Sequence, residues 1–127
     1  MQKILIVEDE LAYSKLLSSQ LESRGYKIVT AKDGEEGLAK AKKEQPDLTL
    51  LDIRMPKMDG MALLEQLRRQ MGPKHRKIII LTNLEPDQRI LQKVVTQLPS
   101  YYFIKSNIGL EDLMSKIESL LAEPDMP

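Results

Sequence analysis

Three acids, one hydroxyl and one amine stand at the ends of four short apolar runs in this sequence: Glu8, Asp9, Asp52, Thr82 and Lys105. If these runs are neighbouring strands, the three carboxylates converge. Two like charges about 4 Å apart repel by roughly 4 kcal/mol at an effective dielectric constant of about 20. One lysine offsets only one of three negative charges. The cluster must therefore raise its pKa values or bind a cation.

Such a set of groups suits phosphoryl transfer. Hard oxygen ligands in a small open site favour Mg²⁺ (or Mn²⁺), which keeps several waters and leaves room for a phosphate oxygen. A carboxylate attacks phosphorus, while the metal and the lysine neutralise charge on the phosphoryl oxygens. The hydroxyl of Thr82 can donate a hydrogen bond to one of those oxygens. The residue types alone thus predict a carboxylate that accepts a phosphoryl group with the help of a metal.

The apolar runs that must position these groups lie at residues 4–7, 26–30, 48–51, 78–82 and 101–104. Three runs are nearly continuous in Val, Ile and Leu, which is typical of strands covered on both faces. Segments of helical periodicity lie between the runs. Five such alternations predict a three-layer α/β domain with a parallel sheet and right-handed crossovers. Ligands bind outside the carboxyl ends of such strands, so the polar residues should share one edge.

Apolar residues at helical spacing mark the inward faces of the expected helices. The inward candidates are Leu11, Leu17 and Leu21, then Leu38 and Ala41, then Leu64 and Leu67, then Ile90 and Val94, and last Leu110, Leu113, Ile117 and Leu120. The last two helices carry more apolar residues than one inward face needs. Three of them, Val95, Met114 and Leu121, are candidates for an exposed contact surface.

Composition excludes several classes of protein. The chain has 127 residues, of which 42% are hydrophobic, and its 19 basic and 19 acidic residues give a formal net charge of zero. We therefore expect one globular domain over residues 1–122 with a short disordered tail over 123–127. A neutral surface argues against nucleic acid or an anionic membrane as a direct partner. The absence of cysteine excludes disulfides and thiolate chemistry, and no apolar run resembles a signal peptide or a membrane span. These features predict a cytoplasmic protein.

Ordered motifs along the chain resemble the receiver domains of two-component response regulators, of the chemotaxis-regulator type, from Lys3 to about Leu121. The matching segments are residues 4–10 (ILIVEDE), 31–38 (AKDGEEGL), 46–60 (PDLTLLDIRMPKMDG), 79–82 (IILT) and 102–105 (YFIK). The string Asp-x-x-Met-Pro-x-x-Asp-Gly is the most specific of them. The resemblance implies a flavodoxin-like, doubly wound sheet of five strands in the order 2-1-3-4-5, with five helices.

The resemblance also implies a role for each residue of the site. Asp52 matches the phosphoacceptor. Glu8 and Asp9 match the acidic pair that holds Mg²⁺ or Mn²⁺, with Asp9 as the direct ligand and Glu8 acting through water. The backbone carbonyl of Arg54 completes the protein's share of the metal shell.

Three further matches concern the response to phosphorylation. Thr82 matches the switch hydroxyl, Lys105 the lysine that pairs with the phosphoryl group, and Tyr102 the aromatic residue that changes rotamer when Thr82 moves. By strand alternation Tyr101 points to the opposite face from Tyr102, and which of the two lies inside depends on register. His75, the only histidine, is expected in a loop and not as a phosphocarrier.

The function implied by the resemblance is phosphorylation-dependent signalling, with a sensor histidine kinase or a histidine phosphotransfer protein as donor. The receiver catalyses only its own phosphorylation and dephosphorylation. A downstream protein is expected to bind the surface of the fourth helix, fifth strand and fifth helix, and homodimerisation on phosphorylation is a further hypothesis. Two alternatives stay open: a phosphorelay intermediate, and a pseudo-receiver that binds partners without phosphorylation. An aspartyl-phosphate hydrolase is disfavoured, because Arg54 stands where a second acid is expected.

Three residues depart from the family pattern. Asn83 stands where a small residue usually follows the switch threonine, which predicts altered phosphorylation or dephosphorylation kinetics. Ser106 stands where a proline with a cis bond usually follows the lysine. A cis bond to a non-proline residue costs roughly 2.5–4 kcal/mol, so we expect a trans bond here. Gly37 replaces an alanine in the second helix and is expected to affect local flexibility.

Overall fold

The computed structural model describes residues 1–54, 60–71, 77–97 and 99–124. Its five strands are β1 (Lys3–Val7), β2 (Lys27–Ala31), β3 (Leu48–Leu51), β4 (Ile78–Thr82) and β5 (Tyr101–Ile104). Its helices are α1 (Leu11–Ser23), α2 (Gly34–Glu44), α3 (Gly60–Met71), α4 (Gln88–Gln97), the short 3₁₀ helix η2 (Lys105–Asn107) and α5 (Leu110–Ala122).

The strands form one parallel sheet in the order β2-β1-β3-β4-β5. The order reverses at β1 and β3, because β1 pairs with β2 on one side and with β3 on the other. In the register of the sheet, Val7 lies beside Leu51, and Leu51 lies beside Ile80. The carboxyl ends of β1, β3 and β4 therefore meet at one edge, as the sequence predicted. The α/β class, the five strands and their order are all confirmed.

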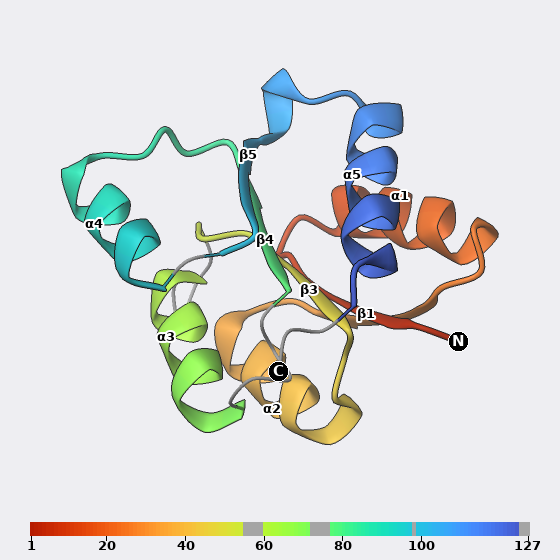
Figure 1. Ribbon diagram of the computed structural model, residues 1–127, viewed down its shortest axis with the longest axis horizontal. Coiled ribbons are helices and arrows are strands. Elements are labelled where there is room, and N and C mark those ends of the chain that lie inside the picture. The colour runs from red at the N-terminus through yellow and green to blue at the C-terminus, as the bar shows by residue number, and fades with distance from the viewer. Residues whose placement is uncertain (55–59, 72–76, 98, 125–127) are drawn as a thin grey trace.

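Two apolar layers enclose the sheet, and Figure 1 shows the helices on its two sides. Helices α1 and α5 cover one face around buried residues that include Leu17, Leu21 and Ile117. Helices α2, α3 and α4 cover the other face around residues that include Leu64 and Leu67. Strands β3 and β4 are buried along their whole length, which fits their unbroken apolar sequences.

The structure corrects the predicted burial of Leu11, Met114 and Leu121 and leaves that of Val95 untested. Leu11 is 66% exposed, because it begins α1 at the rim of the sheet and not above it. Met114 and Leu121 are buried in the layer beneath α5, so they form core and not the expected contact surface. The side chain of Val95 lies outside the described part of the structure. The tail prediction also falls partly outside it, at residues 125–127.

Two glycines have separate structural roles. Gly25 has φ +95°, a left-handed conformation that lets the chain leave α1, and the N–H of Tyr26 then donates to the Leu21 carbonyl. At Gly37 an added Cβ would lie 3.0 Å from a Val7 methyl and 3.2 Å from Leu63. Gly37 therefore serves packing of α2 against β1, beyond the flexibility that its sequence context predicted.

None of the helices in the described part of the chain combines the length and the apolar character that crossing a membrane requires.

Candidate functional site

The candidate site lies at the carboxyl ends of β1 and β3, where Glu8 and Asp52 directly follow the strands. The N–H of Glu8 still donates to the Ala31 carbonyl at 2.9 Å, and the N–H of Asp52 donates to the Val7 carbonyl at 3.0 Å. Sheet hydrogen bonding thus fixes the backbone of both acids. Glu8 and Asp52 are 5% and 7% exposed, whereas Asp9 is exposed. The two buried acids are expensive to ionise unless a cation or a donor faces them.

The three acids converge as the sequence predicted. One carboxylate oxygen from each of Glu8, Asp9 and Asp52 lies within 4.8 Å of the others. All three ligands are hard oxygens, and Asp9 leaves the cluster open to water. This donor set fits a small divalent cation such as Mg²⁺, which retains part of its hydration shell.

Lys105 reaches into the same cluster from the start of η2. Its ammonium donates to Glu8 Oε1 and, at 3.0 Å, to Asp52 Oδ2. Burial opposes the charge on Lys105, but the hydrogen bonds to the two carboxylates outweigh burial and raise the pKa of its ammonium. If all three acids are ionised, this one ammonium leaves two negative charges uncompensated. A divalent cation would balance them.

The surroundings of Glu8 oppose its ionisation. Burial, reinforced by the nearby charge of Asp52, raises the pKa of Glu8 to about 7. Hydrogen bonds from Lys105 and from the N–H of Glu10 to the carboxylate partly oppose this shift. The charge of Glu8 therefore depends on what else occupies the cluster.

Asp52 is held at both of its oxygens. The N–H of Arg54 donates to Asp52 Oδ1 at 2.9 Å, opposite the contact between Oδ2 and Lys105. The predicted ligand role of the Arg54 carbonyl stays a prediction, and residues 55–59 of the motif lie outside the described residues. Gly60 begins α3 directly against the backbone of Asp52 and Ile53. An added Cβ there would lie 2.4 Å from the Ile53 Cα, so only glycine lets α3 start so close to the acidic strand end.

Thr82 lies at the end of β4 and is fully buried. Its hydroxyl oxygen accepts a hydrogen bond from the N–H of Leu84 at 3.3 Å, so the contact described for it is with its own loop and not with Asp52. Tyr102 contacts the same loop, because its hydroxyl donates to the Leu84 carbonyl at 2.7 Å. The loop after β4 is thus tied to both residues that the resemblance assigns to the switch.

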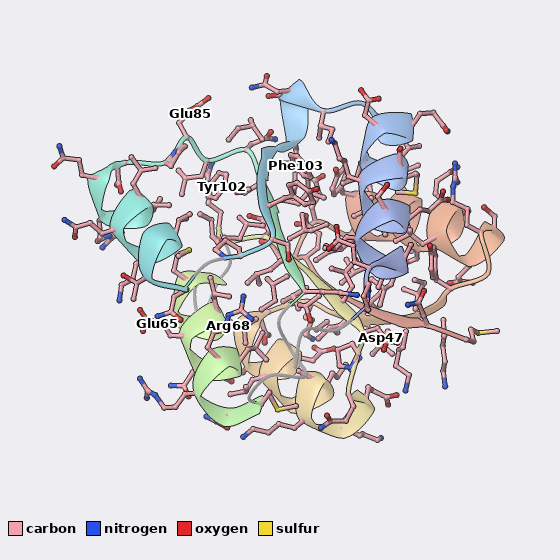
Figure 2. The ribbon with its side chains drawn as sticks, viewed as in Figure 1. Asp47, Glu65, Arg68, Glu85, Tyr102 and Phe103 are labelled. Carbon is pink, nitrogen blue, oxygen red and sulfur yellow. The ribbon has the colours of Figure 1, made fainter. Side chains whose placement is uncertain are left out.

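The register of β5 answers the question about the two tyrosines. Tyr102 packs with the apolar layer on the α3 and α4 side, whereas Tyr101 packs on the α5 side. Figure 2 shows Tyr102 and the next residue, Phe103, on opposite sides of β5. Burial, reinforced by the charge of Glu85, raises the pKa of Tyr102 to about 12, so its hydroxyl remains a donor at neutral pH.

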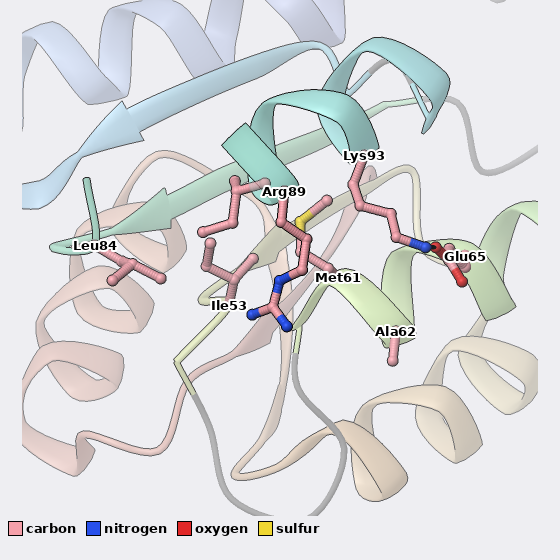
Figure 3. Close-up of a pocket in the computed structure, with 8 residues that line it drawn as sticks. Ile53, Met61, Ala62, Glu65, Leu84, Arg89 and Lys93 are labelled. Carbon is pink, nitrogen blue, oxygen red and sulfur yellow. Dashed lines mark hydrogen bonds and ion pairs between the residues drawn. The ribbon is translucent and has the colours of Figure 1, made fainter. Parts of the chain in front are cut away.

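A cavity of about 230 Å³ lies between α3 and α4, next to this loop. Its apolar wall includes Ile53, Met61 and Ile90, and Figure 3 shows Lys93 of α4 reaching to Glu65 of α3 beside it. None of the three clustered acids is among its described lining residues. The described lining of this open pocket thus consists of residues other than the three clustered acids.

Sequence reasoning missed one residue of the site. Tyr13 lies in the first turn of α1, and its ring centroid is 4.6 Å from the ammonium of Lys105. An aromatic face at this distance attracts a cation and helps to hold it. The available signal was its position four residues after Asp9, which places it above the carboxyl edge of β1.

The departures at residues 83 and 106 meet in space. The peptide bond between Lys105 and Ser106 is trans, as expected. The N–H of Ser106 donates to Asn83 Oδ1 at 3.0 Å, a contact that sequence reasoning did not foresee.

Comparison with known proteins agrees with this geometry. A family model described as the response regulator receiver domain matches residues 4–118. The DNA-binding dual master transcriptional regulator RpaA of Synechocystis is 34% identical over 125 residues, which are 98% of this chain and 51% of that protein. The chain thus spans about half the length of this relative.

Two solved structures show the same likeness. A CheY-like response regulator receiver domain protein from Methanospirillum hungatei superposes with a TM-score of 0.86 at 31% identity, covering 95% of this chain and 94% of that one. The response regulator TrrA of Thermotoga maritima, solved in complex with Mg²⁺ and beryllium fluoride, gives a TM-score of 0.80 at 32% identity, covering 94% and 99%.

Proposed function

The chain belongs to the response regulator receiver domain family, which acts in two-component signalling, and from this premise we propose that it accepts a phosphoryl group on Asp52. The donor would be a histidine kinase or a histidine phosphotransfer protein, and the reaction would require Mg²⁺ or Mn²⁺. The observation that carries the proposal is the convergence of Glu8, Asp9 and Asp52 within 4.8 Å, with Lys105 donating to two of them.

The residues suit the transfer step by step. An oxygen of Asp52 forms a bond to phosphorus while the bond between phosphorus and the donor nitrogen breaks, and the nitrogen keeps the electron pair and takes a proton. Glu8, Asp9 and Asp52 would hold the metal, with the Arg54 carbonyl. The metal, when bound, neutralises charge on the phosphoryl oxygens. Lys105 already lies against Asp52 and would shift its hydrogen bond onto a phosphoryl oxygen.

Loss of the phosphoryl group would use the same residues. Water attacks phosphorus and the bond between phosphorus and the Asp52 oxygen breaks, which regenerates the Asp52 carboxylate, while inorganic phosphate leaves with the oxygen and the protons of that water. We propose no reaction on other substrates. The chain would act as a signalling protein that catalyses its own phosphorylation and dephosphorylation.

The proposed response starts at Thr82. A hydroxyl that leaves the Leu84 amide could donate to a phosphoryl oxygen, and the loop would follow it. The hydrogen bond from Tyr102 to the Leu84 carbonyl would then break or move, which changes the surface formed by α4, β5 and α5. Leu91 on α4, 49% exposed, is the apolar residue we propose for partner docking there.

We also propose the bounds, the location and the oligomeric response of the receiver unit. The receiver unit would comprise residues 1–122, a cytoplasmic location stays a prediction from the sequence, and homodimerisation would follow phosphorylation. Light scattering with and without beryllofluoride and Mg²⁺ tests the last of these. A monomer in both conditions would contradict it.

Intact-mass spectrometry tests the central reaction. Incubation with phosphoramidate and Mg²⁺ should add one phosphoryl mass to the wild type and none to Asp52→Ala. The matched control is Asp47→Asn, because Asp47 precedes the same strand at its opposite end (Figure 2), where it accepts a hydrogen bond from the N–H of Lys3. This variant should still be phosphorylated.

Other results of the mass measurement would contradict different parts of the proposed function. Added mass in Asp52→Ala would move the acceptor elsewhere. Added mass on Asp52 without a divalent ion would refute the metal requirement alone. No added mass in the wild type, from phosphoramidate or from a phosphorylated histidine kinase, would favour the pseudo-receiver.

A further inference from the structure

The loop after β4 and the segment after β5 share a contact that the chemistry above does not use. Asn83 Oδ1 accepts a hydrogen bond from the backbone N–H of Ser106, with 3.0 Å between the two atoms. Asn83 directly follows Thr82, and Ser106 directly follows Lys105. The contact therefore joins the two segments that carry the hydroxyl and the ammonium of the site.

The contact needs two unusual residues at once. Receivers of the pattern that this sequence resembles have a small residue at the first position and proline at the second. Alanine at position 83 would offer no side-chain acceptor, and proline at position 106 would offer no N–H donor. The two departures are thus chemically complementary, which neither of them shows alone.

The position of the donor explains what the contact can do. Ser106 lies in the first turn of η2, where backbone N–H groups have no partner within the helix. The residue before η2, Ile104, provides no side-chain cap. Asn83 supplies the missing acceptor from another loop and so fixes the start of η2. Lys105 is the first residue of that helix, and its ammonium lies between two carboxylates.

We propose that Asn83 is a positioning residue, which holds the backbone of Ser106 and through it keeps the ammonium of Lys105 within reach of a phosphoryl group on Asp52. The inference rests on the proposed phosphoryl transfer. Asn83 acts through Lys105 and not by touching the reacting atoms. Because Asn83 is joined to Thr82, a shift of the switch hydroxyl is passed directly to the segment that carries Lys105.

The expected effect is modest, because Asn83 and Ser106 are both exposed and water can replace either partner. A net hydrogen-bond contribution of ordinary size corresponds to a change of roughly three- to tenfold in a rate or an equilibrium constant.

The first test needs neither metal nor phosphoryl donor. Amide hydrogen exchange of Ser106, measured by NMR on ¹⁵N-labelled protein, should be roughly three- to tenfold faster in Asn83→Ala than in the wild type. Asn83→Asp keeps an acceptor oxygen and should retain protection of this amide. Ser106→Ala removes the hydroxyl but keeps the N–H and should also retain it. Equal exchange in the wild type and Asn83→Ala would overturn the contact itself.

The second test asks whether the contact acts through Lys105. Phosphorylation by phosphoramidate and Mg²⁺, followed by intact mass, should be roughly three- to tenfold slower in Asn83→Ala than in the wild type. In a Lys105→Ala background, Asn83→Ala should cause no further change. An effect of undiminished size in that background would mean that Asn83 acts on the phosphoryl group or its donor directly, which overturns the positioning role. A faster rate in Asn83→Ala would overturn it as well.

The two proposals fail in different ways. If the wild type gains no phosphoryl mass, the proposed function fails and this inference with it. If the wild type gains the mass on Asp52 and Asn83→Ala does so at an equal rate, the function stands and the positioning role alone is refuted. Thermal unfolding of each variant, followed by circular dichroism, separates these outcomes from loss of the fold.

Discussion

Helices α4 and α5 flank the same edge of the sheet from opposite faces, yet the protein holds them very differently (Figure 1). Helix α5 buries five apolar residues against the sheet and α1: Leu113, Met114, Ile117, Leu120 and Leu121. In α4, among residues whose burial is described, only Ile90 is buried. Helix α5 is thus part of the core, whereas α4 contacts the core mainly through Ile90 among the residues whose burial is described.

Ion pairs join each of these helices to a neighbouring segment. Arg24, which directly follows α1, pairs with Glu111 and Glu118 of α5, beside a well-packed apolar layer. Helix α4 meets α3 through the pair of Lys93 and Glu65, next to a cavity of about 230 Å³. Apolar stabilisation scales with buried area, and among the residues whose burial is described α4 buries fewer apolar side chains than α5. Helix α4 should therefore move at a lower free-energy cost than α5.

The difference has a consequence for signalling. The acidic residues follow β1 and β3 in the middle of the sheet, where the ladder fixes their backbone. Thr82 and the loop that Tyr102 contacts lead instead into α4. After a change of charge at Asp52, we therefore expect the backbone at the ends of β1 and β3 to stay in place and α4 to move.

The largest expected effect compares one buried isoleucine from each helix. Ile117→Ala in α5 should lower the free energy of unfolding by about 2–5 kcal/mol, because it leaves a cavity in a tightly packed layer. Ile90→Ala in α4 should lie at or below the low end of that range, since Ile90 already borders a cavity. Urea denaturation followed by circular dichroism measures both values. An equal or larger loss for Ile90→Ala would break the comparison between the helices.

Much of the fold could be predicted from the sequence, because the signals are local. The runs at 48–51 and 78–82 are apolar throughout, and strands buried on both faces require that. The exposed position of Leu11 was missed because helical spacing gives the face of a residue but not where the helix overhangs the sheet. Met114 and Leu121 were missed because the breadth of the buried face of α5 depends on its contact with α1 as well as with the sheet.

The candidate site likewise has one part that the sequence predicts and one part that it does not. The meeting of Glu8, Asp9 and Asp52 follows from strand order, which the resemblance to receiver domains implies, whereas the alternation of strands and helices predicts only a parallel sheet. The contacts of Lys105 with Tyr13 and of Asn83 with Ser106 join residues from different loops. No periodicity encodes such pairs, because they depend on loop conformation and on side-chain rotamers. The described structure was needed to find them.

A smaller change in the free energy of unfolding is expected at β5, on whose opposite faces Tyr102 and Tyr101 lie. Tyr102→Phe removes the hydrogen bond to the Leu84 carbonyl and should lower the free energy of unfolding by about 0.5–1.5 kcal/mol. The penalty should shrink when beryllofluoride and Mg²⁺ are present, because the proposed switch already moves this contact. Tyr101→Phe, on the opposite face of the same strand, is the matched control and should respond equally in both conditions. A Tyr102→Phe penalty that beryllofluoride does not change would separate Tyr102 from the switch.

The smallest expected effect concerns the ion pair that joins α4 to α3. The side chains of Lys93 and Glu65 are 45% and 26% exposed, so water and salt screen their attraction. A double-mutant cycle with Lys93→Met and Glu65→Gln should give a coupling of about 0.2–1 kcal/mol at low salt, and less in 1 M NaCl, where the screening length falls to about 3 Å.

This pair is not the only polar link between the two helices, because Arg68 Nε–H of α3 also donates to the Gln97 carbonyl of α4 at 3.0 Å. A cycle through Arg24→Met and Glu118→Gln, a pair that joins the residue after α1 to α5, is the matched control and should give a coupling in the same range. Similar couplings would mean that apolar burial, and not charge, makes the two helices differ. A coupling well above 2 kcal/mol for Lys93 and Glu65 alone would show α4 to be clamped in place, and the proposed switch would then need to break that clamp before any surface could change.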